Sequence, residues 1–195
     1  MKRDIILAGV GGQGIISIAA IIGTAALEQG LFLKQSEVHG MSQRGGDVQS
    51  NLRISDNEIA SDLIPFGKAD LIISVEPLEA LRYLPYLSPD GWVITSTKPF
   101  NNIPDYPEID TVLAEIRKLP HYIALDADKI ARELGSLKAA NIVILGAASL
   151  FLGMKYEKME EAVRIIFRNK TEDVIIKNLQ ALKAGKDFSE RQMNP

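Results

Sequence analysis

The sequence predicts an α/β protein with a Rossmann-like open, mostly parallel sheet, helices on both faces of that sheet and a helical C-terminal part. Short apolar, β-branched runs bounded by glycine alternate with helical patterns, as they do in doubly wound sheets. Helical patterns then dominate from residue 139 to residue 183. The 195 residues are enough for one good-sized α/β core and few for two, so we predict a single domain over residues 1–195.

The first strand and helix follow from two apolar segments. Asp4–Val10 is a β-branched run that fits a strand buried on both faces. Gly14–Gln29 is apolar nearly all round and lacks proline, which predicts a buried helix with Gly30 as its C′ residue. A second strand, Leu31–Gln35, then leads into a polar, glycine-bearing loop, Ser36–Gly46.

The rest of the chain continues the alternation of strands and helices. Even spacing of apolar residues predicts a strand with one packed face over Asp47–Ile54. The longest uncharged run, Ala139–Met154, is shorter than the roughly 20 residues of a membrane-spanning helix, so we predict a buried core helix there. The other predicted elements are strands at Asp70–Val75, Gly91–Ser96 and His121–Leu125, helices at Glu76–Leu84, Thr111–Lys118 and Asp126–Leu134 with Asp126 as N-cap, and an extended connection at Thr97–Pro107.

Composition excludes several classes of function. A net charge of −3 and a pI near 5.5 give no general basic field, so we predict neither nucleic acid nor a membrane as a partner. The sequence has no cysteine, which excludes disulfides, cysteine-ligated iron–sulfur clusters and thiol nucleophiles. Redox chemistry must then occur on another chain. Met1–Asp4 pass directly into a strand-like run without a signal-type stretch, from which we expect a cytoplasmic location.

A glycine-rich turn between the first strand and the first helix is the first candidate site. Glycines in a Gly-x-Gly-x-x-Gly pattern permit a sharp turn, close approach of a ligand and tight helix–strand packing. The N–H groups and dipole of the following helix favour an anion such as a pyrophosphate. The candidate cofactor-binding residues of this turn are Gly9, Gly11, Gly12, Gln13 and Gly14.

Three interpretations of this turn remain open. The first is a dinucleotide site in which Glu37, 23 residues after Gly14, holds the ribose hydroxyls. The second is a site for another anionic or pantetheine-type ligand. The third is a structural turn or an interface with no bound nucleotide.

The loop Ser36–Gly46 is the second candidate site. Ligands of doubly wound sheets lie just outside the carboxyl ends of the strands, so we expect this loop and the glycine-rich turn to face the same crevice. A guanidinium at Arg44, followed by two glycines, can bind a carboxylate or phosphate bidentately, or pair with Glu37 or a partner chain. The candidate residues of this loop are Ser36, Glu37, His39, Arg44, Gly45 and Gly46.

His39 and Arg44 are the two catalytic candidates. An imidazole can carry a proton near neutral pH, so His39 is a candidate proton carrier or substrate contact, with a simple hydrogen bond to the backbone as the alternative. The other histidine, His121, is more than eighty positions away, and neither has a carboxylate cluster beside it. We therefore predict no metal site.

The two motifs together resemble the gamma-type domain of 2-oxoacid:ferredoxin oxidoreductases. The signatures of that family are a Gly-x-Gly-Gly-Gln-Gly turn near the N-terminus and a loop ending in Arg-Gly-Gly before a strand. They occur here as Gly9–Gly14 and Arg44–Gly46. The form of Ser36–Gly46 is most similar to the indolepyruvate branch, the indolepyruvate ferredoxin oxidoreductase beta subunit, and the resemblance extends over most of the chain.

The resemblance implies a small subunit that supports oxidative decarboxylation of arylpyruvates or other 2-oxoacids to acyl-CoA. It places thiamine diphosphate and iron–sulfur clusters on a larger catalytic partner, with ferredoxin as an indirect partner. It implies no resident cofactor on this chain but allows a contact with coenzyme A, and the isolated chain should be inactive. The residues alone leave open a stand-alone NAD(P)- or FAD-binding oxidoreductase, or a non-catalytic assembly module.

Overall fold

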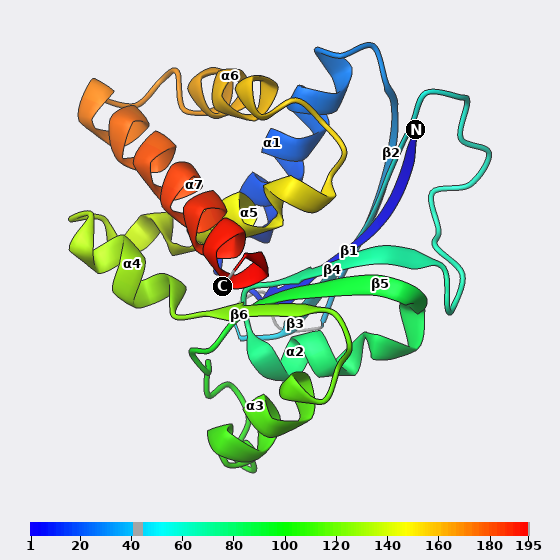
Figure 1. Ribbon diagram of the computed structural model, residues 1–195, viewed down its shortest axis with the longest axis vertical. Coiled ribbons are helices and arrows are strands. Elements are labelled where there is room, and N and C mark those ends of the chain that lie inside the picture. The colour runs from blue at the N-terminus through cyan, green and yellow to red at the C-terminus, as the bar shows by residue number, and fades with distance from the viewer. Residues whose placement is uncertain (41–44, 195) are drawn as a thin grey trace.

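The computed structural model describes residues 1–40 and 45–194, and in them a six-stranded sheet lies between two layers of helices (Figure 1). The strand order is β2-β3-β1-β4-β5-β6. β3 runs antiparallel to both of its neighbours, whereas the pairs β1–β4, β4–β5 and β5–β6 are parallel. The predicted open, mostly parallel sheet is confirmed. The strands are β1 (Lys2–Val10), β2 (Phe32–His39), β3 (Asp47–Ser55), β4 (Ala69–Ser74), β5 (Leu87–Ser96) and β6 (Tyr122–Leu125).

Helices cover both faces of the sheet, as predicted. One layer contains α1, α4, α5, α6 and α7, and α2 and α3 form the other (Figure 1). The helices are α1 (Ile15–Leu27), α2 (Pro77–Arg82), α3 (Ile109–Arg117), α4 (Ala127–Glu133), α5 (Ala140–Ala148), α6 (Tyr156–Ile166) and α7 (Glu172–Met193), with 3₁₀ turns at Leu84–Tyr86, Leu137–Ala139 and Ser149–Phe151.

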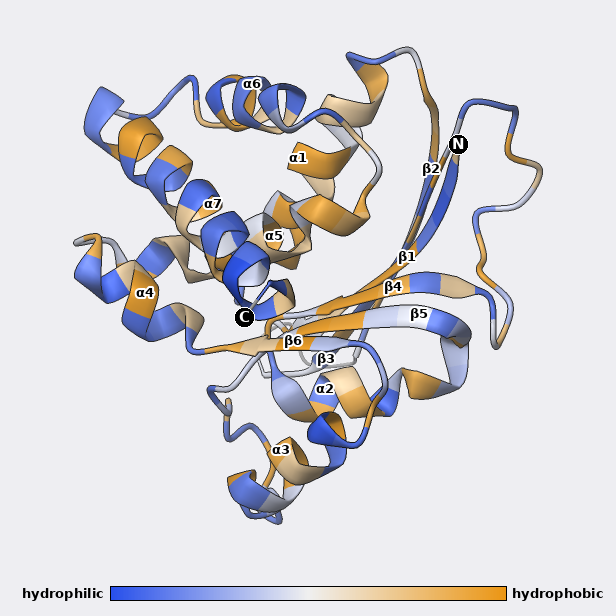
Figure 2. Ribbon diagram, in the orientation of Figure 1, coloured by the Kyte–Doolittle hydropathy of each residue, from blue (hydrophilic) through white to orange (hydrophobic). Residues whose placement is uncertain are grey.

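Strand β1 shows why the sheet needs both helix layers. Ile5 and Leu7 pack against the α1 layer, and Ile6 and Ala8 pack against the α2 layer, because successive side chains of a strand point to opposite faces. All four are fully buried. Figure 2 shows the apolar residues concentrated in the central strands and in α1 and α5, with hydrophilic residues on α6 and α7.

Two glycines let helix α7 cross the buried helix α5 at close range. A Cβ on Gly146 would overlap the carbonyl oxygen of Leu182, and a Cβ on Gly185 would overlap the carbonyl oxygen of Val143. Backbone meets backbone here, so neither glycine leaves room for a side chain. The C-terminal helices thereby form one packed layer over the sheet.

Three predicted boundaries were wrong. Ser36–His39 belongs to β2, because this edge strand pairs with β3 from Phe32 to His39. Strand β5 begins at Leu87, not Gly91. The buried core helix ends early, because the hydroxyl of Ser149 donates to the carbonyl of Gly146 over 2.7 Å and a 3₁₀ turn begins there.

The predicted end of the first helix is confirmed. Gly30 has a φ of 69°, and the N–H of Leu31 donates to the carbonyl of Ala26 over 3.1 Å, which closes the helix in the manner of a Schellman motif. Every helix within the described ranges is too short or too polar to cross a membrane.

Candidate functional site

The glycine-rich turn connects the carboxyl end of β1 to α1. The N–H of Val10 donates to Oε1 of Gln13 over 2.8 Å, and the N–H of Gln13 donates to the carbonyl of Val10 over 3.1 Å. Gln13 therefore closes the turn with both its side chain and its backbone. Gly12 and Gly14 have φ values of 101° and 82°, a region that favours glycine.

Three glycines of this turn serve three different purposes. A Cβ on Gly9 would lie 2.5 Å from Cγ2 of Val75, so its absence permits close packing. A Cβ on Gly14 would overlap the side-chain amide of Asn141. A Cβ on Gly12 would meet nothing within 4 Å among the described residues. Gly12 is therefore the position at which a ligand can approach the backbone.

The second glycine-bearing segment lies against this turn. The N–H of Gly11 donates to the carbonyl of Gly46 over 2.8 Å, and Asp47, the first residue of β3, pairs with Val10, the last residue of β1. The described parts of the two candidate segments are thus side by side at one edge of the sheet. Arg44 lies outside the described residues, so its role as an anion ligand stays a prediction.

Two side chains from distant parts of the chain anchor the second segment. Nδ2 of Asn102 donates to the carbonyl of Gly45 over 2.9 Å, and the hydroxyl of Tyr83 donates to Oδ2 of Asp47 over 3.4 Å. Burial, reinforced by the carboxylate of Asp47, raises the pKa of Tyr83 well above its ordinary range, so the hydroxyl stays a donor. Sequence reasoning missed both contacts because the partners are far apart in the chain.

His39 contacts a neighbouring side chain, and both of its predicted roles, proton carrier or hydrogen bond to the backbone, stay predictions. Its Nε2 lies 2.5 Å from Oε1 of Glu37, two residues earlier on the same face of β2. His39 is exposed, and it lines a hollow of about 320 Å³ together with residues of the glycine-rich turn. Ser36 points to the opposite face of β2, so it does not join them. Across the described ranges, no three His, Cys, Asp or Glu side chains group as a metal site requires.

A larger crevice lies on the other side of the glycine-rich turn, over the carboxyl ends of β4, β5 and β6. Two hollows of about 390 and 580 Å³ share Gly12, Gln13, Lys138 and Asn141 in their walls. Nδ2 of Asn141 donates to the carbonyl of Gly14 over 3.0 Å, which joins the N-terminus of α5 to that of α1. Sequence reasoning missed Lys138 and Asn141. Their position at the start of an apolar helix was the available signal.

This crevice has the character of an anion site. The N-termini of α1 and α5 meet there, and helix N-termini carry unpaired N–H groups and a positive dipole end. Lys138 lines both hollows and Lys170 lines the larger one, whereas Asp128 adds one negative charge to the smaller. Phe100 and Leu137 contribute exposed apolar surface. The arrangement suits a phosphate-bearing ligand with an apolar or amide arm.

The position of β3 argues against a dinucleotide site of the usual kind. In the usual doubly wound order, the second strand lies beside the first and its acidic residue reaches the ribose. Here β3 separates them, which moves β2 to two strand spacings, roughly 10 Å, from β1. Glu37 is on that displaced strand, and its carboxylate contacts His39.

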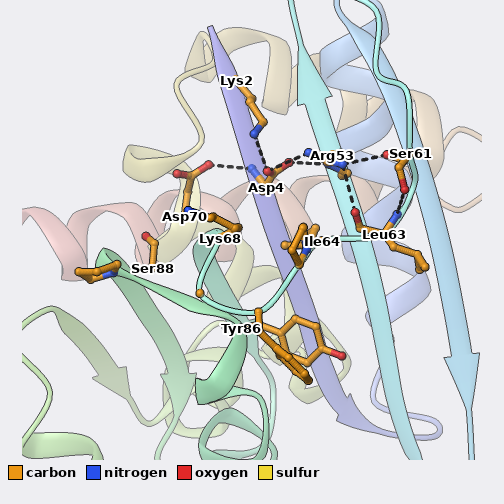
Figure 3. Close-up of a pocket in the computed structure, with 14 residues that line it drawn as sticks. Lys2, Asp4, Arg53, Ser61, Leu63, Ile64, Lys68, Asp70, Tyr86 and Ser88 are labelled. Atoms are coloured by element: carbon orange, nitrogen blue, oxygen red, sulfur yellow. Dashed lines mark hydrogen bonds and ion pairs between the residues drawn. The ribbon is translucent and has the colours of Figure 1, made fainter.

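A cavity of about 710 Å³, larger than either hollow of the crevice, is at the opposite, amino end of the sheet (Figure 3). Its central carboxylate, Asp4, is 1% exposed and receives Nε and Nη2 of Arg53 at 2.7 and 3.1 Å and Nζ of Lys2 at 2.8 Å. Nη1 of Arg53 also donates to the carbonyls of Ser61 and Leu63. Arg53 and Lys2 are thus both paired with Asp4, and Arg53 fastens the Ser61–Leu63 loop to the sheet.

Solved structures with the same fold define the class of protein. The gamma subunit of a keto/oxoacid ferredoxin oxidoreductase from Geobacter sulfurreducens is 26% identical, with a TM-score of 0.72 over 97% of this chain and 99% of that chain. A 2-oxoglutarate:ferredoxin oxidoreductase from Magnetococcus marinus superposes with a TM-score of 0.76 at 21% identity, over 97% of this chain and 31% of that chain. The fold is that of the small, gamma-type unit of these oxidoreductases.

Sequence comparison gives the family. The profile of the pyruvate ferredoxin/flavodoxin oxidoreductase family matches residues 4–188. The chain is 40% identical to indolepyruvate oxidoreductase subunit IorB of Archaeoglobus fulgidus, over 95% of this chain and 94% of the relative, and 38% identical to the subunit of that name from Thermococcus kodakarensis, over 94% of each. This chain belongs to the pyruvate ferredoxin/flavodoxin oxidoreductase family, which confirms the resemblance seen in the two motifs.

Proposed function

We propose that the chain is the small subunit of an indolepyruvate (arylpyruvate):ferredoxin oxidoreductase, in which all of residues 1–195 form one gamma-type domain. The main support for this proposal is that relatives named as indolepyruvate oxidoreductase subunits match this chain over nearly their whole length. A relative named as 2-oxoglutarate synthase subunit KorC, from Methanothermobacter marburgensis, is only 29% identical over a similar length. The arylpyruvate branch is therefore the best-supported substrate class.

The proposed division of labour follows from what this chain can and cannot hold. Without cysteine it has no ligands for an iron–sulfur cluster of the ordinary kind. As the resemblance to the family implies, we assign thiamine diphosphate and the clusters to a larger catalytic partner, which passes electrons to ferredoxin in the cytoplasm. This chain contributes a shaped crevice and an interface, and the isolated chain is expected not to turn over.

The crevice fits coenzyme A, whose thiol would accept the acyl group. Phosphates would meet the backbone N–H groups at Gly12 and Gly14, the N-terminus of α1 and Lys138. The pantetheine arm would lie along the exposed surfaces of Phe100 and Leu137. Arg44 is the further anion ligand predicted by the sequence. The Magnetococcus marinus structure, of which this chain matches 31% of the length, is described with 2-oxoglutarate, coenzyme A and succinyl-CoA bound.

Co-expression of the chain with a larger, cysteine-rich subunit encoded beside it tests the proposal. The purified complex should reduce ferredoxin when given indolepyruvate and coenzyme A, and should prefer indolepyruvate or phenylpyruvate to pyruvate and 2-oxoglutarate. Each subunit alone should be inactive. A complex that forms but prefers 2-oxoglutarate would overturn the substrate class, and a chain that oxidises a substrate unaided would overturn the subunit role.

Calorimetry on the isolated chain separates coenzyme A from a dinucleotide. We expect saturable binding of coenzyme A, with dephospho-coenzyme A weaker because it lacks one anionic group, and no saturable binding of NADH or FAD. Tight binding of NADH or FAD would instead support a stand-alone NAD(P)- or FAD-binding oxidoreductase, the alternative against which the position of β3 between β1 and β2 argues.

A further inference from the structure

A buried carboxylate near the carboxyl-end crevice has no part in the proposed ligand contacts. Glu76 follows β4 and is 1% exposed. Its Oε2 accepts the N–H of Glu79 over 2.8 Å and so caps the first turn of α2. A carboxylate is costly to bury and needs more than one such partner. The partners of its other oxygen, Oε1, therefore indicate a second role for Glu76.

Oε1 of Glu76 receives two hydrogen bonds from the connection between β5 and α3. The hydroxyl of Tyr106 donates over 2.5 Å and the N–H of Phe100 over 3.3 Å. Burial, followed by the hydrogen bond to Glu76, raises the pKa of Tyr106 well above its ordinary range, so the phenol remains a donor. Both ends of this connection are thus tied to one carboxylate.

The same connection reaches the second glycine-bearing segment. Asn102 lies between the two tied residues, and its side chain donates to the carbonyl of Gly45 over 2.9 Å. The next glycine, Gly46, accepts the N–H of Gly11 in the glycine-rich turn over 2.8 Å. Phe100 itself lines the crevice. One chain of described contacts therefore runs from the carboxylate to both glycine segments.

We propose that Glu76 is a positioning residue: through Phe100 and Tyr106 it fixes residues 97–107 as a wall of the crevice, and through Asn102 it holds Gly45 and Gly46 against the glycine-rich turn. It does not touch the ligand. It sets the width of the opening that an anionic thiol cofactor enters, a consequence that rests on the proposed function.

Two substitutions at this position separate positioning from folding. Glu76→Gln keeps an oxygen for Tyr106 and Phe100 but loses the charge, and it replaces the acceptor of the Glu79 N–H with an amide NH2, so it removes the helix cap and leaves the connection tied. Glu76→Asp keeps the charge and remains a good helix N-cap, but its carboxylate is one methylene shorter and withdraws from the connection. Tyr106→Phe removes one hydroxyl. Tyr156→Phe is the matched control, because the Tyr156 hydroxyl is buried and lacks a hydrogen-bond partner within the described residues.

The measurement is hydrogen–deuterium exchange of the complex, read at peptides 97–107 and 45–49. We expect exchange in both to rise about three- to tenfold in Glu76→Asp and Tyr106→Phe, as for loss of one hydrogen bond, and to stay unchanged in Glu76→Gln and Tyr156→Phe. The KM for coenzyme A should rise by a similar factor in Glu76→Asp and Tyr106→Phe, while kcat changes little. Faster exchange in 97–107 with none in 45–49, or equal effects of all four variants, would overturn the proposal.

The exchange result does not depend on catalysis. If the wild-type complex showed no activity with any 2-oxoacid, the proposed function would fail while the exchange comparison still decided the role of Glu76. If activity were normal and exchange were unchanged in Glu76→Asp and Tyr106→Phe, the positioning role alone would fail.

Discussion

The two ends of the sheet use charge in opposite ways. At the amino end, a cavity of about 710 Å³ includes Asp4 in its wall, and that carboxylate is already paired with Arg53 and Lys2. At the carboxyl end, smaller hollows have two helix N-termini and Lys138 in their walls. Arg53 and Lys2 at the amino end are paired with a buried carboxylate, whereas Lys138 at the carboxyl end is exposed and lines both hollows.

This difference is the reason why we place the proposed ligand site at the carboxyl end and not in the more voluminous cavity at the amino end. A ligand entering the amino-end cavity would have to compete with ion pairs that are already formed, and it would gain little. A phosphate entering the carboxyl-end crevice would meet the backbone N–H groups of Gly12 and Gly14, which lack an acceptor among the described residues. Substitutions at the two ends should therefore separate stability from ligand binding.

The largest expected effect on stability is at the amino end. Arg53→Met leaves the carboxylate of Asp4 buried with one exposed partner, so we expect a loss of about 3 kcal/mol and a fall in Tm of roughly 6–12 °C. Thermal and urea denaturation of the purified chain measure it. The KM for coenzyme A in the complex should not change, because no residue of the carboxyl-end crevice is altered.

Lys2→Met is the control for this variant. It removes the other cation from the same carboxylate, but Lys2 is 60% exposed, so the loss should be under about 1 kcal/mol. If Lys2→Met and Arg53→Met lowered the free energy of unfolding equally, burial of the cation would not determine how much each ion pair with Asp4 stabilises the chain.

The second prediction concerns a pair of glycines with similar backbones and different surroundings. Gly12 and Gly30 both have positive φ, and a Cβ on either would meet nothing within 4 Å among the described residues. Gly12→Ala and Gly30→Ala should therefore each cost about 1 kcal/mol from backbone strain alone. Only Gly12 faces the crevice, so only Gly12→Ala should weaken coenzyme A binding, by about tenfold or more.

Calorimetry and denaturation on the two variants test this directly. If Gly30→Ala weakened coenzyme A binding as much as Gly12→Ala, the open space beside Gly12 would not be a ligand site. If Gly12→Ala bound coenzyme A normally, the glycine-rich turn would have only the structural role that the sequence left open.

Most of the fold could be predicted because local pattern decides it. The apolar run of β1, the αL residue at Gly30 and the N-cap at Asp126, whose side chain accepts the N–H of Lys129, each depend on a few neighbouring residues. The insertion of β3 between β1 and β2 could not be predicted, since strand order depends on pairing between distant segments. The length of β2 was missed for the same reason, because pairing with β3 extends it through His39.

The candidate site was predicted only where it is local. The glycine pattern marked Gly12 and Gly14, and of the second loop the described residues Gly45 and Gly46 lie beside that turn. Asn141 was missed because its contact with Gly14 spans 127 positions, and Glu76 was missed because a single acid before a proline gives no sign that it is buried. Contacts of this kind follow from the sheet topology and not from sequence spacing.

The smallest expected effect is that of one exposed cation at the carboxyl end. Lys138→Met should raise the KM for coenzyme A about two- to fivefold without changing Tm, because an exposed charge contributes about 0.5–1 kcal/mol to an anion. The increase should shrink as salt is raised from 0.05 to roughly 0.5 M, since ions screen exposed charges. Lys118→Met, an exposed lysine on the opposite helix layer, is the matched control and should leave KM unchanged at every salt concentration. A rise in KM that persisted at high salt would mean that Lys138 acts by shape and not by charge, and the contrast between the two ends of the sheet would then need another cause.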